Sequence, residues 1–274
     1  MIKLGGTMVG NGATNWSYDV WPTFPATLAN FQIIQQSLLA DWETEGCAGY
    51  FHNVRPATKT PKCIAMAKRM NDLSGSLNWY DLYRKNYDLP MTTNEDRIGT
   101  TVINGEERTY KRGMTQAEYT PFATHILDSP SAHVSNGDFL TDYMNREDVR
   151  GAFNIADDVQ TWEMCSSTLR YNVQDEASMW IYPVLRHQTK LMFYSGDTDG
   201  AITTLGSKMW MKELGWEVTE AYRPWFTNGQ VSGYTEQYDG LKFVTVKGVG
   251  HMAPQWARQP VTNMIMAHVH GEEF

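Results

Sequence analysis

The stretch FYSGDTDG, residues 193–200, joins a largely apolar run to a loop that carries two carboxylates, Asp197 and Asp199. The apolar letters in front of that loop predict a buried strand that ends at a glycine. A second apolar run, LKFVTV at 241–246, also ends in glycines and leads to His251 within VKGVGHMAP. An aspartate after one strand and a histidine after the next predict the acid–base half of a catalytic triad.

The last third of the chain alternates strand-like and helix-like segments, which is typical of the end of an α/β sheet. The predicted elements are strands at 190–196 and 241–246, an antiparallel pair at 216–226 and 230–240, a helix at 204–214 stopped by Gly215, and a final helix opened by Pro260 and closed by Gly271. In open α/β sheets, functional groups collect at the carboxyl ends of the strands. Asp199 and His251 both follow such ends.

The first half of the chain has a weaker pattern. Residues 2–10 predict a short strand, followed by a glycine-rich turn in which Asn11 can take positive φ. From 28 to 90 the apolar spacing is helical, beginning with LANFQIIQQSLLADWE, and another helix begins at Tyr143. The polar stretch at 104–113, NGEERTYKRG, predicts a hairpin or a loop.

Each candidate side chain also has a structural interpretation. An aspartate after a strand often bonds to local amides, and we expect this of Asp197 within its own loop. For Asp199 alone, a turn role and a catalytic role are equally good, and its pairing with His251 favours catalysis. His251 could be a satisfied core histidine, but the glycines before it and Pro254 after it are typical of a loop that aims a side chain into a cleft.

Composition excludes several classes of protein. The 274 residues have a formal net charge of −8 and 23 Lys and Arg without a long basic run, which argues against nucleic acid and anionic membrane as partners. The sequence has no apolar stretch long enough for a transmembrane helix. Residues 1–10 lack the apolar core of a signal peptide, so we expect any targeting segment to lie outside this chain.

The sequence also contains three cysteines and one N-glycosylation sequon. Cys47 and Cys63 flank a polar stretch and could close a loop, or could be two free thiols of a cytosolic protein. Cys165 is then either a free thiol or bonded to a partner outside this chain. The triplet NWS makes Asn15 a candidate glycosylation site, which is weak evidence because such triplets arise by chance.

Several motifs together resemble the serine carboxypeptidases, acid-acting α/β-hydrolases that remove residues from peptide C-termini. GDTDG resembles the family's G-D-x-D, and GVGHMAP resembles G-A-G-H-M-V-P, with Val249 and Ala253 as mild departures. LGGTMVGNG resembles L-K-G-x-x-I-G-N-G, the family's segment after the nucleophile helix, and NREDVRGAFNI resembles its segment after the helical insertion. The resemblance is strong at 188–260 and loose at 50–135.

The resemblance implies an α/β fold, namely a partial α/β-hydrolase sheet with a helical insertion, or cap, subdomain. The core would comprise residues 1–27 and 145–274, and the helical and irregular insertion would comprise 28–144. His251 would act as general base and then general acid, with Asp199 as its orienter. Met252 and Ile202 would line the pocket for the leaving residue. No metal or organic cofactor is implied, and peptide C-termini would be the substrates.

Two catalytic motifs of the family are absent from this sequence. The family's nucleophile lies in G-E-S-Y-x-G, but the sequence contains no G-x-S-x-G, nor the N-G-G-P-G of the oxyanion hole. We therefore expect a C-terminal fragment that is inactive alone and whose missing N-terminal part would be its partner. In the family, the cysteine of W-x-x-C, here Cys165, is bonded to that part. An oxidising compartment follows, either the vacuole or lysosome or the extracellular space.

Two other functions stay open. An acyltransferase of the same family would pass the acyl group to an alcohol instead of water, and nothing around Asp199 or His251 separates the two activities. A non-catalytic binding module would have lost the nucleophile. Intact motifs around both residues argue against this module, because loss of the serine would remove the constraint on them. An in-frame G-E-S-Y-x-G upstream of Met1 would decide.

Overall fold

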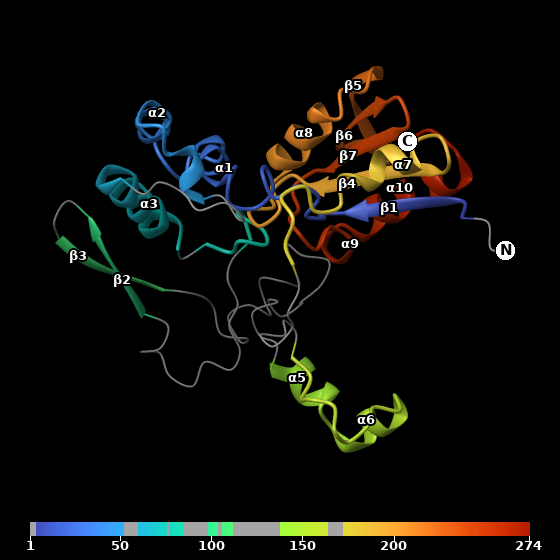
Figure 1. The fold of residues 1–274 in the computed structure, drawn as a ribbon, viewed down its shortest axis with the longest axis horizontal. Coiled ribbons are helices and arrows are strands. Elements are labelled where there is room, and N and C mark those ends of the chain that lie inside the picture. The colour runs from blue at the N-terminus through green and yellow to red at the C-terminus, as the bar shows by residue number, and fades with distance from the viewer. Residues whose placement is uncertain are drawn as a thin grey trace. The chain divides into compact units, whose positions relative to one another are not determined.

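The computed structural model describes residues 4–51, 60–75, 77–84, 98–103, 106–111, 138–163 and 172–274 (Figure 1). The chain divides into two compact units, one formed by residues 1–85 with 173–274 and the other by residues 86–172. The division into a core and an insertion at residues 27 and 145 stays a prediction.

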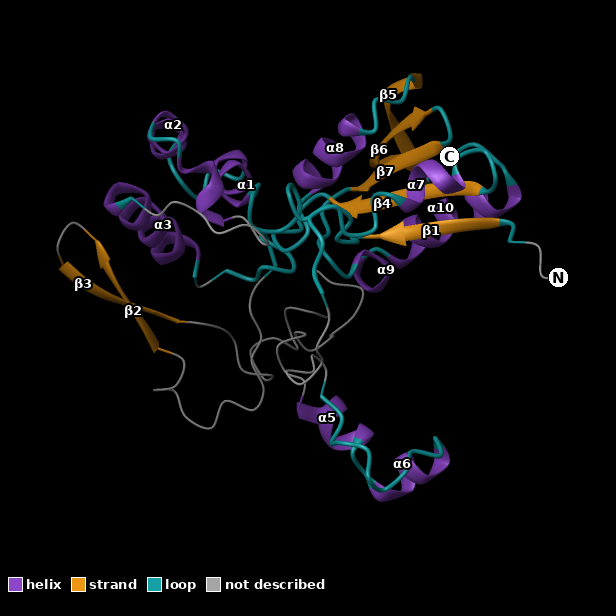
Figure 2. Cartoon of the chain, viewed as in Figure 1, coloured by secondary structure: helices purple, strands orange, loops and turns teal. Residues whose placement is uncertain are grey.

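The first unit is built on a mixed five-stranded sheet of order β1-β4-β7-β6-β5 (Figures 1 and 2). The strands are β1 (Gly6–Gly10), β4 (Lys190–Gly196), β5 (Val218–Thr227), β6 (Gln230–Tyr238) and β7 (Leu241–Val246). The first three strands of that order run parallel, whereas β6 and β5 are antiparallel additions. The predicted strands at 190–196 and 241–246 and the predicted antiparallel pair are confirmed.

Side chains alternate between the two faces of the sheet, as the pleat requires. Leu191 and Phe193 pack with Trp210 of α8 (Thr204–Glu213), in a cluster that also holds Tyr182 of α7 (Ile181–Leu185). Met192, between them in the strand, belongs instead to the cluster formed with α9 (Ala253–Trp256) and α10 (Arg258–His270). Both faces of β4 are therefore buried, which explains its nearly continuous apolar sequence.

The helix ends follow capping chemistry. The Thr203 hydroxyl accepts a hydrogen bond from the Gly206 amide at the start of α8, and Gly215 follows that helix with φ +67°. Gly271 ends α10 in the left-handed conformation, as predicted. That helix begins at Arg258, two residues before the predicted start. Within the described ranges, no helix is both long and apolar enough to cross a membrane.

A helical lobe belongs to the same unit. It consists of α1 (Phe24–Asn30), α2 (Gln36–Thr44), the 3₁₀ helix η1 (Cys47–Phe51) and α3 (Pro61–Ser74). Its core includes Phe24, Leu28, Trp42 and Met70. The helical pattern predicted from residue 28 is interrupted after α1, because Gln32 takes positive φ and the amides of Ile33 and Ile34 donate to the Leu28 carbonyl.

The second unit contains an antiparallel hairpin of β2 (Ile98–Ile103) and β3 (Glu106–Lys111), and two short helices, α5 (Asp138–Met144) and α6 (Glu147–Ala152). Of the hairpin or loop predicted at 104–113, the structure shows one strand of a hairpin, β3, whose partner β2 precedes the predicted stretch. The helix predicted from Tyr143 is broken, because Arg146 has extended backbone angles before α6 begins.

Candidate active site

The three parallel strands end at the same edge of the sheet, so the loops that follow them meet there. β1 leads into the turn that begins at Asn11, β4 into the loop that carries Asp199, and β7 into the loop that carries His251. Carboxyl ends of parallel strands are where α/β proteins place their functional groups.

Asp199 and His251 are hydrogen-bonded at this edge. Asp199 Oδ2 lies 2.7 Å from His251 Nδ1, and Asp199 Oδ1 accepts bonds from the amides of Ala201 (2.8 Å) and Ile202 (3.0 Å). Asp199 is 1% exposed, whereas the His251 side chain keeps 30% of its surface exposed. The predicted proximity of the two residues is confirmed. With Nδ1 bound to the carboxylate, the remaining nitrogen, Nε2, is the one that can exchange a proton with a substrate group.

Burial raises the pKa of the Asp199 carboxyl above its ordinary value. The hydrogen bond and charge of His251 and the two loop amides act in the opposite direction, because they favour the ionised form. The carboxylate is thus held away from water and depends on His251 for compensation. Such a group fixes an imidazole in one orientation and stabilises its protonated form.

Asp197 does not follow the prediction. Its Oδ1 accepts a 2.7 Å hydrogen bond from the amide of Gly248, which belongs to the His251 loop and not to the aspartate's own loop. Burial is the main cause that raises the pKa of Asp197, and the Gly248 amide lowers it in part. The prediction of a backbone amide partner was right, and its location was wrong, because the partner lies far away in the sequence.

Asn11 is a site residue that sequence reasoning assigned only to a turn. It takes the predicted positive φ, at +45°, and is 4% exposed. Its Oδ1 accepts a 2.8 Å hydrogen bond from the Gly196 amide, and its Nδ2 donates to the carbonyls of Gly250 (3.2 Å) and His251. One side chain therefore joins the end of β4 to the His251 loop. The GNG sequence signals the turn, but no local pattern reveals these distant partners.

The two predicted pocket residues lie beside the pair. Ile202 is 9% exposed and donates its amide to Asp199, while Met252 follows His251 and packs against the cluster under α9 and α10. Their role in binding a leaving residue stays a prediction.

Three serines lie near Asp199 or His251 in the sequence, and the hydrogen-bond partners of their hydroxyls are groups other than His251. Ser195 Oγ is 2.8 Å from Thr204 Oγ1, Ser207 donates to the Thr203 carbonyl, and Ser232 donates to the Gln230 carbonyl. That none of these serines is the nucleophile stays a prediction.

The cysteine and sequon predictions have different outcomes. Cys47 and Cys63 form a disulfide with Cα atoms 5.5 Å apart, which confirms that prediction. Cys165 lies outside the described residues. Asn15 is 3% exposed, and its Nδ2 contacts Met179 Sδ at 3.0 Å, so an attached glycan would have to displace Met179. Glycosylation there stays a prediction that this burial disfavours.

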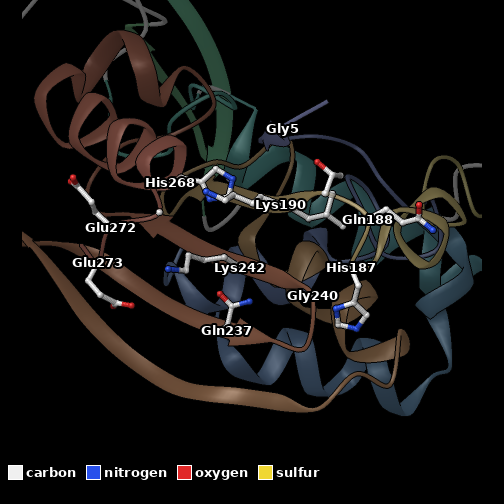
Figure 3. Close-up of a pocket in the computed structure, with 13 residues that line it drawn as sticks. Gly5, His187, Gln188, Lys190, Gln237, Gly240, Lys242, His268, Glu272 and Glu273 are labelled. Carbon is white, nitrogen blue, oxygen red and sulfur yellow. The ribbon is translucent and has the colours of Figure 1, made fainter. Parts of the chain in front are cut away.

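A separate cavity of about 570 Å³ lies at the opposite edge of the sheet, where β4 and β7 begin. Figure 3 shows the side chains around it, among them Lys190, Lys242, His187, His268, Glu272 and Glu273. Because groups of both charges share its wall and neither Asp199 nor His251 reaches it, we place the candidate site at the other edge, where the hydrogen-bonded pair is.

A family model described as "Serine carboxypeptidase" matches residues 1–271. This chain belongs to the serine carboxypeptidase family. "Serine carboxypeptidase 1" of Hordeum vulgare is 29% identical over 94% of this chain and 54% of its own length. "Serine carboxypeptidase-like 21" of Arabidopsis thaliana is 25% identical over 100% of this chain and 59% of its own length. The chain thus spans between half and three fifths of these relatives.

A solved structure has the same fold. The chain superimposes with a TM-score of 0.60 and 15% identity on Kex1(Δ)p, described as a prohormone-processing carboxypeptidase from Saccharomyces cerevisiae. The match covers 98% of this chain and 55% of the Kex1(Δ)p chain. The prediction of an α/β-hydrolase sheet with helical insertions is confirmed.

Proposed function

We propose that this chain supplies the aspartate and the histidine of a serine-type carboxypeptidase and that the nucleophilic serine comes from polypeptide outside these 274 residues. The observation that carries the proposal is the 2.7 Å hydrogen bond between buried Asp199 and partly exposed His251 at the carboxyl edge of the sheet. Membership of the family supports the reaction class.

The chemistry follows from which ring nitrogen is free. The serine oxygen would attack the carbonyl of the last peptide bond as His251 Nε2 takes the serine proton. That nitrogen would return the proton to the leaving amino group, which leaves an acyl-enzyme and a free C-terminal residue. Water would then attack the acyl-enzyme, with His251 again as base and then as acid. Asp199 would hold the ring and stabilise its protonated form throughout.

Transfer to an alcohol is the alternative second step. Both reactions share the acyl-enzyme and differ only in the acceptor, so the geometry of Asp199 and His251 serves either. Hydrolysis is our proposal because it is the reaction that the family name describes. Assays with an added alcohol would separate the two by the product formed, ester or free acid.

The disulfide supports a place in the secretory pathway. Cys47–Cys63 closes a loop in the helical lobe, and disulfides persist in oxidising compartments. We propose the vacuole, the lysosome or the extracellular space for the protein, and a bond from Cys165 to the polypeptide that carries the serine.

The test compares two purified proteins on an N-blocked dipeptide. The 274-residue chain should release no C-terminal residue above background. A longer polypeptide, read from the transcript upstream of Met1 and containing G-E-S-Y-x-G, should release it. His251→Ala should lower kcat of the longer protein by roughly 10⁴-fold or more. His270→Ala, an exposed histidine near the end of α10, should leave kcat unchanged.

Two results would contradict the proposal. Turnover by the 274-residue chain that His251→Ala abolishes would place a nucleophile within it. A complete transcript without an upstream nucleophile motif, together with an inactive protein, would favour the non-catalytic binding module.

A further inference from the structure

Residues 78–84, NWYDLYR, approach the candidate site from the helical lobe, and we call them the clasp. The amide of His251 donates a 2.6 Å hydrogen bond to the carbonyl of Tyr80. The amide of Gly200, next to Asp199, donates a 2.9 Å bond to the carbonyl of Trp79. One short segment therefore holds the backbone on both sides of the Asp199–His251 pair.

A third backbone bond and a buried side chain complete the attachment. The amide of Leu82 donates to the carbonyl of Thr198 at 2.9 Å. In return, the Thr198 hydroxyl donates a 2.8 Å bond to Asp81 Oδ1. Asp81 is 2% exposed and Thr198 is 3% exposed, so neither group has water as a substitute partner. Loss of the Asp81 carboxylate would leave the buried Thr198 hydroxyl without this partner, whereas Asp81 Oδ1 would keep the Tyr83 amide at 3.1 Å if Thr198 were lost.

The fit between the clasp and the His251 loop depends on a missing side chain. A Cβ placed on Gly250 would collide with the Tyr80 carbonyl oxygen and with Asp81. The Tyr80 ring lies 5.3 Å from the His251 ring, centroid to centroid, at a tilt of 54°. The clasp thus contacts the imidazole as well as its backbone.

The clasp is anchored at both ends. Trp79 packs on Phe24 of the lobe core, with ring centroids 4.8 Å apart. The Arg84 guanidinium lies 4.1 Å from the ring centroid of Trp256 in α9, and its Nε is 3.5 Å from Asp81 Oδ2. These contacts connect the lobe that carries the disulfide to the loops that carry the acid–base pair.

From these contacts we infer that the clasp positions the Asp199–His251 pair and that the Asp81–Thr198 hydrogen bond is its latch. Asp81 is then a positioning residue, which acts through Thr198 on the loop of Asp199 and through the Tyr80 carbonyl on His251. The inference rests on the proposed function for the role of the pair. Its test follows the geometry of His251 and not turnover, so its failure is distinct from a failure of the proposed function.

The test compares the 274-residue chain with four variants, and a fifth variant serves to assign one NMR signal. Thr198→Val and Asp81→Ala remove the latch, whereas Asp81→Asn keeps an oxygen that can accept from Thr198. The matched control is Thr219→Val, at an exposed position on β5. One readout is hydrogen exchange at the amides of His251, Gly200 and Leu82. The other is the far-downfield NMR signal of the His251 Nδ1 proton, assigned through its loss in Asp199→Asn.

Both latch variants should speed exchange at the three clasp amides by roughly fivefold to tenfold, the effect of one lost buried hydrogen bond. Exchange in the middle of β4 should not change, and the His251 Nδ1 signal should weaken. Asp81→Asn and the Thr219 variant should match the parent. A general structural defect would instead raise exchange in β4 as well.

Wild-type exchange and an intact Nδ1 signal in Thr198→Val would overturn the inference. Equal effects of Asp81→Asn and Asp81→Ala would also overturn it, since the hydrogen bond would then not be the cause. Should Asp81→Ala fail to fold, Thr198→Val alone decides, because it replaces one hydroxyl by a methyl group of similar size.

Discussion

Asp197 Oδ1 and the Gly248 amide, 2.7 Å apart, form a hydrogen bond that joins the loop of Asp199 to the loop of His251. Gly248 is exposed and Asp197 is partly buried, so this contact lies at the surface of the two loops. The loops of Asp199 and His251 are therefore hydrogen-bonded to each other directly. Both loops also form hydrogen bonds with Asn11 and with the clasp.

Asp197→Ala should lower the free energy of unfolding by about 1 kcal/mol, the net value of one such hydrogen bond. Asp197→Asn should recover most of this loss, since its amide oxygen can still accept from Gly248. Urea titration followed by circular dichroism measures both, with Asp41→Ala on the exposed side of α2 as the control. If Asp41→Ala lowered the free energy of unfolding as much as Asp197→Ala, the hydrogen bond to Gly248 would make no specific contribution to stability.

Gly196 should not tolerate a side chain. A Cβ there would collide with the carbonyl oxygens of Val249 and Gly250 in the His251 loop, and backbone atoms cannot move aside as a side chain can. Gly196→Ala should lower the unfolding free energy by about 1–3 kcal/mol. Gly5→Ala, which meets nothing within 4 Å, should have little effect. Equal unfolding midpoints for the two variants would show that the loops pack less closely than described.

Asp19 should make stability depend on pH. Its carboxylate accepts bonds from the amides of Thr14 (2.6 Å) and Asn15 (2.8 Å), but burial raises its pKa from 3.8 to about 6. A raised folded-state pKa means that the folded protein binds the proton more tightly. This contribution is therefore complete below pH 3.8 and is lost as the pH rises through about 6. Its size is on the order of 3 kcal/mol.

Asp19→Asn isolates that contribution, because the amide oxygen can accept both backbone bonds and does not titrate. The slope of unfolding free energy against pH between 3.8 and about 6 should become more positive in this variant than in the parent. Asp41→Asn, at an exposed position, should keep the parental slope. Identical slopes in Asp19→Asn and the parent would mean that Asp19 titrates at its ordinary value.

The cysteines give a chemical prediction. Alkylation of the denatured, unreduced chain should label Cys165 alone, and digestion should recover one cross-linked peptide containing Cys47 and Cys63. Replacing both bonded cysteines by alanine should cost roughly 3 kcal/mol of unfolding free energy. A peptide that links Cys165 to either of the others, seen by mass spectrometry, would contradict the proposed pairing.

The sequence predicted which strands end beside Asp199 and His251, because the patterns that indicate strands and turns are local. Apolar runs bounded by glycine placed β4 and β7 to the residue, and the position of Asp199 and His251 just after these strands then brought them together. Parallel neighbours end at the same edge whatever lies between them in the chain.

What the sequence did not predict depends on distant contacts. The hydrogen-bond partner of Asp197 lies in another loop. No hydrophobic periodicity within the clasp predicts its contact with His251. The break at Gln32 interrupts a continuous helical pattern, because the chain turns there to pack α2 beside α1 in the lobe core. Tertiary packing overrides local preference in each case.

Labelling with a fluorophosphonate shows whether a chain contains the nucleophile, because the reagent reacts with a serine that a neighbouring histidine activates. The 274-residue chain should take up no label, although Asp199 and His251 are in place. The longer polypeptide should be labelled at one serine upstream of Met1, and His251→Ala should abolish that label. Stoichiometric labelling of Ser195, Ser207 or Ser232 in the 274-residue chain, lost in His251→Ala, would instead place the nucleophile within these 274 residues.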